Sequence, residues 1–269
     1  MPRALRGAVV IVTGASSGIG AATAVACGRE GMRVVLAARR KDRLERVADQ
    51  VRASGAEARV VPTDVREEAA VQALVDGTVA AWGRLDVLVN NAGAGLLATV
   101  ADTRAAEFEA MMRVNYLAVV YGILAALPHM RRQGNGHIVN VASVVGKRAV
   151  PFLAAYAAAK FAVVGLSEAL RMEVRREGIR VTCVCPVGTA TEFHDAAENR
   201  LGVPSPGGGP VQSAEHVAKG IVRALRRARP EVHPYPPARA LFVMNAVAPG
   251  LVDRLMMALS PRARRLGAR

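Results

Sequence analysis

Three polar residues in the second half of the chain have types and a spacing that suit proton transfer. Tyr156 and Lys160 are four residues apart, so on a helix they share one face, with an ammonium beside a phenol. A nearby positive charge favours the phenolate, and we expect it to lower the Tyr156 pKa from about 10 towards the pH at which a general acid or base works. Ser143 lies just past a predicted strand, thirteen residues before Tyr156. A Tyr-x-x-x-Lys spacing is common, so its meaning depends on the motifs around it.

A glycine-rich turn near the N-terminus could bind a diphosphate. The first predicted strand runs into residues 13–20, Thr-Gly-Ala-Ser-Ser-Gly-Ile-Gly, and an Ala-rich helical stretch follows. Glycine lets the backbone approach a pyrophosphate, and the free N–H groups at a helix N-terminus attract its charge. A tight strand-to-helix connection would explain the same glycines, and the Gly-x-x-x-Gly-x-Gly spacing departs from the usual dinucleotide fingerprint.

The end of the second predicted strand is cationic, because residues 39–41 are Arg-Arg-Lys. Folds that bind NAD place an acidic residue there, where it accepts from the ribose 2′-hydroxyl. A guanidinium matches a phosphate instead, so Arg39, helped by Arg40, is expected to hold the 2′-phosphate of NADP. A solvated helix start is the alternative, although cations oppose the dipole of a helix N-terminus by roughly a few tenths of a kcal/mol each.

Polar residues also follow the third and fourth predicted strands, at Asp64 and Asn91. The carboxyl ends of parallel strands meet at one edge of a sheet, where ligands bind. Asp64 could accept a hydrogen bond from an adenine amino group. N-capping the helix that includes Glu67 and Glu68 is an equal and compatible role.

Short Val-rich runs alternate with helical patterns, which is typical of βαβ units on a parallel sheet. The 269 residues are 52% hydrophobic and 4% aromatic, which excludes a disordered chain, a coiled coil and a collagen. We therefore predict an α/β fold, a Rossmann-type doubly wound parallel sheet of six or seven strands with helices on both faces. The predicted strands are 8–13, 33–37, 58–62, 86–90, 137–142 and 180–185, and the predicted helices are 18–30, 41–54, 67–81, 104–132 and 153–177. One domain over 1–235 and a basic helical extension over 236–269 account for the chain.

Taken together, these motifs resemble the short-chain dehydrogenase/reductase family over roughly residues 5–230. The resemblance implies that Tyr156 exchanges a proton with the carbonyl or alcohol oxygen, to which Ser143 hydrogen-bonds. It implies that Lys160 lowers the Tyr156 pKa and holds the nicotinamide ribose. Asn115, in a Val-Asn-Tyr sequence, would hold a water that relays protons through Lys160 to solvent.

The resemblance also implies a cofactor, NADP(H). Pro186 and Thr191 match a family stretch that contacts the nicotinamide amide, although Val187 replaces its usual Gly. Ser17 stands where some NADP-preferring relatives have a basic residue, so cofactor choice depends on the two arginines after the second strand. The residues expected to bind the cofactor are Gly14, Ser16, Ser17, Gly18, Ile19, Gly20, Arg39, Arg40, Asp64, Val65, Asn91, Ala92, Gly93, Tyr156, Lys160, Pro186, Thr189 and Thr191.

The expected activity is hydride transfer between nicotinamide and a carbonyl or secondary alcohol. Cells usually keep NADP reduced, so reduction of an apolar ketone or aldehyde is the expected direction. The alternative is a non-catalytic NADP-binding or scaffold protein whose basic tail docks on a membrane surface or partner, but such a protein needs none of the catalytic residues. The substrate loops, Gly93–Val100, Ser143–Tyr156 and Phe193–Val211, contain Leu96, Leu97, Val145, Phe152 and Phe193, whose alternative role is packing alone. Residues 202–210 within the last of these read as a mobile loop.

The net charge of +14 is concentrated at the C-terminus, since residues 221–269 contain ten Arg and two acidic residues. The sequence around these arginines has no recognition helix of a known DNA-binding motif and no aromatic residues interleaved with the basic ones, so no nucleic-acid partner is expected. Apolar residues from Leu241 to Leu259 recur at helical spacing, broken by Pro249-Gly250. This predicts a helix pair that packs on the active-site mouth or on another subunit, with peripheral membrane contact as the alternative.

The three cysteines and five scattered histidines lack disulfide or zinc spacing, so buried thiols and no metal site are expected. The apolar run before Thr13 is shorter than a signal peptide needs, which favours a first strand and a cytoplasmic protein, possible membrane association aside. Family relatives are often dimers or tetramers joined through helices at about 104–132 and 153–177, so the resemblance implies a homo-oligomer.

Overall fold

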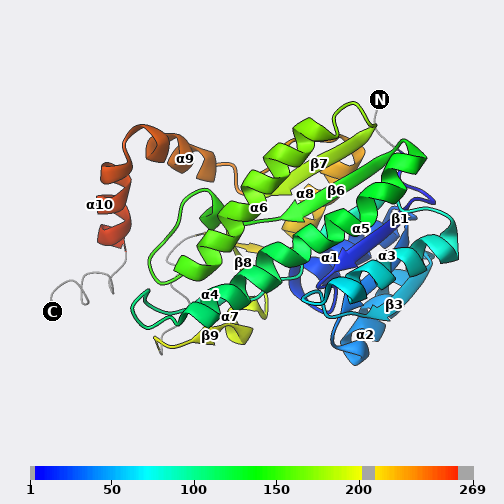
Figure 1. Ribbon diagram of the computed structural model, residues 1–269, viewed down its shortest axis with the longest axis horizontal. Helices are drawn as coiled ribbons and strands as arrows, with labels where there is room; N and C mark the ends of the chain where they lie inside the picture. The colour runs from blue at the N-terminus through cyan, green and yellow to red at the C-terminus, as the bar shows by residue number, and fades with distance from the viewer. Residues whose placement is uncertain (1–3, 202–209, 260–269) are drawn as a thin grey trace.

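The structure is a computed structural model that describes residues 4–201 and 210–259. Its centre is a seven-stranded parallel sheet with the order β11-β7-β6-β4-β1-β2-β3 (Figure 1). This confirms the predicted fold class and all six predicted strands, and Glu231–Val232 supplies the seventh. The strands are β1 Val9–Thr13, β2 Arg33–Ala38, β3 Ala58–Pro62, β4 Val87–Asn90, β6 Gly136–Val141, β7 Ile179–Val184 and β11 Glu231–Val232.

Helices cover both faces of the sheet. One face carries α1 Gly18–Arg29, α2 Lys41–Arg52 and α8 Ala214–Arg226, and the other carries α3 Glu68–Trp82, α5 Ala118–Gln133 and α6 Ala154–Glu173 (Figure 1). Side chains of β1 alternate between these layers: Val10 and Val12 join the first cluster, while Val9 and Ile11 join the second. Burial on both faces explains why this strand is apolar throughout.

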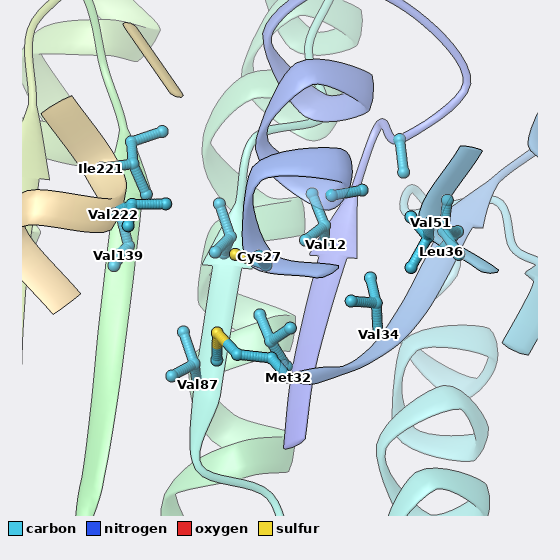
Figure 2. Packing of buried hydrophobic residues seen from close by; sticks show 14 of the residues in the cluster. Val12, Cys27, Met32, Val34, Leu36, Val51, Val87, Val139, Ile221 and Val222 are labelled. Atoms are coloured by element: carbon cyan, nitrogen blue, oxygen red, sulfur yellow. The ribbon is translucent and has the colours of Figure 1, made fainter. Parts of the chain in front are cut away.

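The first of these clusters is built from small and medium side chains. Figure 2 shows Cys27 and Met32 packed over the neighbouring strands β1 and β4, with Val34 and Leu36 of β2 nearby. Among the residues that the structure describes, this cluster contains no aromatic ring, in keeping with the low aromatic content of the chain.

Burial is incomplete at the edge of the sheet. Strand β3 is paired on one side, with β2, and none of its five residues is fully buried. Strand β3 is therefore less buried than the central strands, because an edge strand lacks one neighbour and its covering helices extend less far over it.

The predicted helix at 104–132 is interrupted. The structure has α4 Ala105–Met112, a π-helical turn over Arg113–Leu117, and then α5. By length and composition alone, the run Ala105–Gln133 could cross a membrane. In the fold, however, Gly122, Ile123 and Met130 of α5 are buried in the core, as expected of a helix that packs on a sheet.

Several short elements lie beside the carboxyl edge of the sheet. They are β5 Leu96–Leu97 paired with β9 Glu198–Asn199, β8 Gly188–Ala190 paired with β10 Val211–Ser213, the 3-10 turn Val144–Gly146, and α7 Phe193–Ala196. None of these elements was predicted from the sequence, because elements of two to four residues have no measurable periodicity. The predicted mobile loop at 202–210 lies outside the described residues except for Pro210.

The C-terminal extension forms the expected helix pair, α9 Ala238–Val247 and α10 Pro249–Leu259. Ala248 ends α9 with a φ of −139°, outside the helical region. Pro249 then opens α10, a position where its missing N–H costs nothing. The break thus falls where the Pro-Gly pair predicted it.

Candidate active site

A cavity of about 1680 Å³ opens at the carboxyl edge of the sheet. Such a volume exceeds that of ordinary small-molecule pockets and suits two ligands side by side. Of the twenty residues predicted for the site, all but Gly20 and Asn115 line this cavity. The fold therefore gathers loops that are up to 177 residues apart in the sequence, from Gly14 to Thr191, around one space.

Three of the predicted catalytic residues lie just after β6 and on α6. Ser143 follows β6 and begins the 3-10 turn, where its hydroxyl accepts from the backbone N–H of Val145 at 3.3 Å. Tyr156 and Lys160 are one turn apart on α6, with the Lys160 ammonium 5.6 Å from the centroid of the Tyr156 ring. The ammonium also donates to the carbonyl of Val141 at 2.9 Å. The pair therefore shares one helix face, as the spacing predicted.

A buried hydrogen-bond chain holds α6 against the sheet. Asn90 at the end of β4 donates to Asn140 of β6 at 2.9 Å, and Asn140 donates to the hydroxyl of Ser167 on α6 at 2.9 Å. Ser167 in turn donates to the backbone carbonyl of Val163 at 2.6 Å. Since every member of the chain has a partner, the chain costs little to bury and fixes the position of the helix that carries the predicted catalytic residues Tyr156 and Lys160.

Burial shifts both titratable groups towards their neutral forms. Desolvation raises the pKa of Tyr156 above its usual value, and a hydrogen bond with Ser143 opposes the shift. Desolvation lowers the pKa of Lys160, which is 3% exposed, to about 8. The expected downward shift of the Tyr156 pKa is therefore wrong for this structure, because loss of solvent is the largest effect on the phenol and exceeds that of the hydrogen bond with Ser143.

Asn115 is fully buried in the π-helical turn. Its amide donates to the carbonyls of Ala94 at 3.0 Å and Met111 at 3.1 Å, and its oxygen accepts from the Ala94 N–H at 3.2 Å. A Cβ on Gly93 would lie 2.7 Å from this oxygen and 3.7 Å from the Lys160 nitrogen. Glycine there lets Asn115 approach the lysine, while its role in a water relay stays a prediction.

The glycine turn fits a diphosphate. Gly14 and Gly18 have φ values of +65° and +54°, which a side chain would strain. Ser17 is the N-cap of α1, yet its side chain makes no cap hydrogen bond, so the N–H groups of the first turn remain available to an anion in the cavity. Gly20 serves packing instead: a Cβ there would lie 2.2 Å from the Gly14 carbonyl oxygen.

The two arginines after β2 differ in their contacts. Arg40 donates to the hydroxyls of Ser16 and Ser17 at 3.1 and 3.2 Å and pairs with Glu192 at 3.3 Å. Arg39 also lines the cavity, but within the described residues its side chain makes no hydrogen bond or ion pair. Both arginines were predicted to act together on the cofactor. In the structure Arg40 braces the glycine turn, whereas Arg39 lines the cavity without such a contact, and its binding of a 2′-phosphate stays a prediction.

Asp64 has a local cation partner. The guanidinium of Arg66 donates to both carboxylate oxygens, at 3.0 to 3.1 Å through its Nε, and this lowers the Asp64 pKa to about 2. The N-cap of α3 is Glu67, so the expected capping role of Asp64 is wrong. Its carboxylate lines the cavity in ionised form, where it stays available as an acceptor.

The segment after β7 lines the cavity beside the glycine turn. The Thr191 side chain packs on Gly18, since a Cβ on that glycine would lie 2.9 Å from the Thr191 methyl carbon. Thr189 donates to the carbonyl of Val187 at 3.0 Å, a local turn contact. Replacement of the family's Gly by Val187 is accommodated, and the residue lines the cavity with Pro186.

Apolar side chains line the other end of the cavity. Leu97, Val145, Phe152 and Phe193 reach it as predicted, and the Phe193 ring lies 5.5 Å from that of Tyr156, centroid to centroid. Leu96 does not, because it packs instead in a small buried cluster. Phe152 has a φ of +70°, a strained value for a bulky residue, at a position where it lines the same cavity as Tyr156.

The C-terminal helices line the cavity, which confirms the active-site mouth as a packing site for the predicted helix pair, although Phe242 and Met256 were not among the residues predicted for its apolar spacing. Leu241 and Phe242 of α9 and Met256 of α10 line the cavity, as does Arg148, whose guanidinium is ion-paired with Asp253 of α10. The spacing of apolar residues predicted the two helices, but only their contacts with the loop after β6 show which face of each helix points towards the cavity.

The chain matches a known family over most of its length. The sequence pattern described as short chain dehydrogenase matches residues 8–201. Glycine betaine reductase ATRR of Emericella nidulans is 40% identical over 228 residues, which are 83% of this chain and 18% of that protein. Ketoacyl reductase HetN of Nostoc sp. is 32% identical over 257 residues, which are 93% of this chain and 88% of that protein.

Solved structures agree with the fold and differ in their cofactor. A short chain dehydrogenase/reductase from Burkholderia phymatum in complex with NAD has a TM-score of 0.84 at 31% identity, covering 93% of this chain and 96% of that one. A metagenomic short-chain oxidoreductase in complex with NADP has a TM-score of 0.74 at 34% identity, covering 86% and 98%. The shared architecture thus accepts either nicotinamide dinucleotide.

Proposed function

The chain belongs to the short-chain dehydrogenase family of oxidoreductases, and on this premise we propose that it reduces an apolar ketone or aldehyde with NADPH. One observation carries the proposal: Ser143, Tyr156 and Lys160 line the same cavity as the glycine turn and Arg39. A scaffold protein would have no need for a buried tyrosine and lysine at the wall of a nucleotide-sized cavity.

The cofactor, when bound, supplies the hydride that adds to the carbonyl carbon. The chain's own residues deal with the oxygen. Ser143 donates a hydrogen bond to it and Tyr156 transfers its phenolic proton to it, so that the carbonyl becomes an alcohol and the tyrosine a phenolate. The Lys160 ammonium stabilises that phenolate until a proton from solvent restores the phenol.

Reduction suits the protonation state of the site. Burial raises the Tyr156 pKa, so the phenol is protonated at neutral pH and can act as the acid that carbonyl reduction requires. The surrounding Leu97, Phe152 and Phe193 exclude water and favour an apolar substituent on the carbonyl.

A preference for NADPH follows from charge. No acidic side chain occupies the position after β2 that would accept from a ribose 2′-hydroxyl. Arg39 stands there, and among the described residues its guanidinium has no hydrogen bond or ion pair, although its charge acts on the carboxylate of Asp64. Its planar donors suit the 2′-phosphate.

The proposal is tested by following NADPH oxidation with a panel of aliphatic and aromatic ketones and aldehydes. Tyr156→Phe removes only the proton donor, so turnover is expected to fall by at least about 100-fold while NADPH affinity stays close to wild type. Full activity of this variant would refute the assignment, and so would a wild-type protein that binds NADPH but oxidises it with no carbonyl in the panel.

A further inference from the structure

Both C-terminal helices carry apolar side chains on an inner and an outer face, which are opposite on α9 and adjacent on α10, where Val252 and Leu255 are about 60° apart. Leu241, Phe242 and Met256 line the cavity, and Ala238 and Val252 are buried. At 100° per residue, these positions fall on one side of each helix. The inner face of the pair therefore forms part of the wall at the apolar end of the cavity.

The outer face of the pair is apolar and open to solvent. Val243 and Val247 are one turn apart on α9, with exposed fractions of 66% and 81%, and Leu251 and Leu255 are one turn apart on α10, with 57% and 40%. Figure 1 shows both helices at the edge of the molecule, away from the sheet. Helices that are apolar on both faces are normally covered by protein or lipid.

Two contacts keep the inner face of α9 and α10 turned towards the cavity. Arg148, beside the 3-10 turn, is ion-paired with Asp253 of α10. The ring of Phe242 on α9 packs against that of His233, with centroids 5.4 Å apart. Because these contacts orient both helices, the outer apolar stripes cannot turn towards the body of the protein while the contacts persist.

The charge of this region indicates what covers the outer face. Residues 236–269 contain six Arg and one acidic residue, Asp253, which Arg148 already neutralises. Arg254 is exposed one turn from Leu251 on α10, and residues 260–269, outside the described structure, contribute four of the six Arg. Two copies of the chain meeting here would bring like charges together, whereas an anionic surface would complement them.

We propose that α9 and α10 dock on an anionic lipid bilayer, with Val243, Val247, Leu251 and Leu255 at the boundary of headgroups and acyl chains and Arg254 among the phosphates. This association does not depend on the proposed function. Because the inner face of the same helices lines the cavity, docking would place the apolar end of the cavity beside the bilayer.

The test is flotation of the full-length protein with two kinds of vesicle, phosphatidylcholine alone and phosphatidylcholine with equal parts of phosphatidylglycerol. Wild type is expected to float only with the anionic vesicles, and less at high salt. Val243→Glu with Val247→Glu is expected to weaken binding at least about tenfold, because two charges would enter an apolar boundary. Met172→Glu, at a site 70% exposed on α6, is the matched control and should bind as wild type.

A second variant guards against misfolding of the first. Arg254→Gln replaces one exposed polar side chain by another and should weaken binding by about fivefold, the value of one basic residue near an anionic surface. Equal flotation on both vesicles, or unchanged binding of the folded double variant, would overturn the proposal. It would also be overturned if light scattering showed that wild type is a dimer and the double variant a monomer, because a second copy would then cover the face.

Discussion

Replacing Arg39 and Arg40 one at a time should show that Arg39 selects between the two cofactors and that Arg40 maintains the structure of the site. Arg39 lines the cavity without a hydrogen-bond partner among the described residues, whereas Arg40 joins Ser16, Ser17 and Glu192. Arg39→Ala should therefore weaken NADPH alone. Arg40→Ala should weaken NADPH and NADH alike, because it loosens the turn that both cofactors share.

The expected loss of NADPH affinity in Arg39→Ala depends on how exposed the Arg39 side chain is. A hydrogen bond to a charged partner contributes about 1.5–3 kcal/mol, and solvent screening places the exposed Arg39 at the lower end. About 1.5 kcal/mol corresponds to roughly a tenfold rise in the Kd for NADPH. Arg39→Asp adds repulsion of the 2′-phosphate and an acceptor for a ribose hydroxyl, so its preference should invert towards NADH.

The measurement is the fluorescence titration of each variant with NADPH and NADH, at low and at physiological salt. The NADPH preference of wild type should decline with salt, and that of Arg39→Ala should be small at both concentrations. The reasoning is refuted if Arg39→Ala changes the Kd for the two cofactors equally, or if Arg40→Ala proves to be the variant that affects NADPH alone.

Three further outcomes are expected. Gly20→Ala should lower the free energy of unfolding by about 3 kcal/mol, because its Cβ would meet the Gly14 carbonyl oxygen at 2.2 Å. Gly77→Ala in α3, where no atom lies within 4 Å of the added Cβ, should raise the free energy of unfolding by about 0.5–1 kcal/mol. Denaturant titration measures both changes, and equal changes would contradict the packing argument. Because burial lowers the Lys160 pKa to about 8, kcat/KM for reduction should decline as the pH rises through 8 and the ammonium is lost; a profile that stays flat to about pH 10 would disprove this. Phe152→Gly relieves the strain of a φ of +70° but removes an aromatic ring from the cavity wall. The Tm should therefore change little, while KM for an aromatic ketone rises roughly tenfold. An unchanged KM would exclude the Phe152 ring from the substrate site.

Local patterns were sufficient to predict the framework and most of the site. The alternation of Val-rich runs with helical stretches fixes right-handed βαβ units, and these bring the glycine turn, Asn91 and Ser143 to one edge of the sheet. A separation of four residues on a helix places Tyr156 and Lys160 together whatever surrounds them. These features depend on neighbours in the sequence or on the handedness of the fold.

The sequence by itself determined which residues meet, and the tertiary structure decided their state. Desolvation by distant segments reversed the expected direction of the Tyr156 pKa, since burial is a sum over elements that no spacing encodes. Hydrogen bonds to the glycine turn and to Glu192 separated the role of Arg40 from that of Arg39. The docking of α10 through Arg148 likewise decided which apolar stripe faces the cavity and which is left exposed, because two similar faces of one helix are distinguished only by what packs against them.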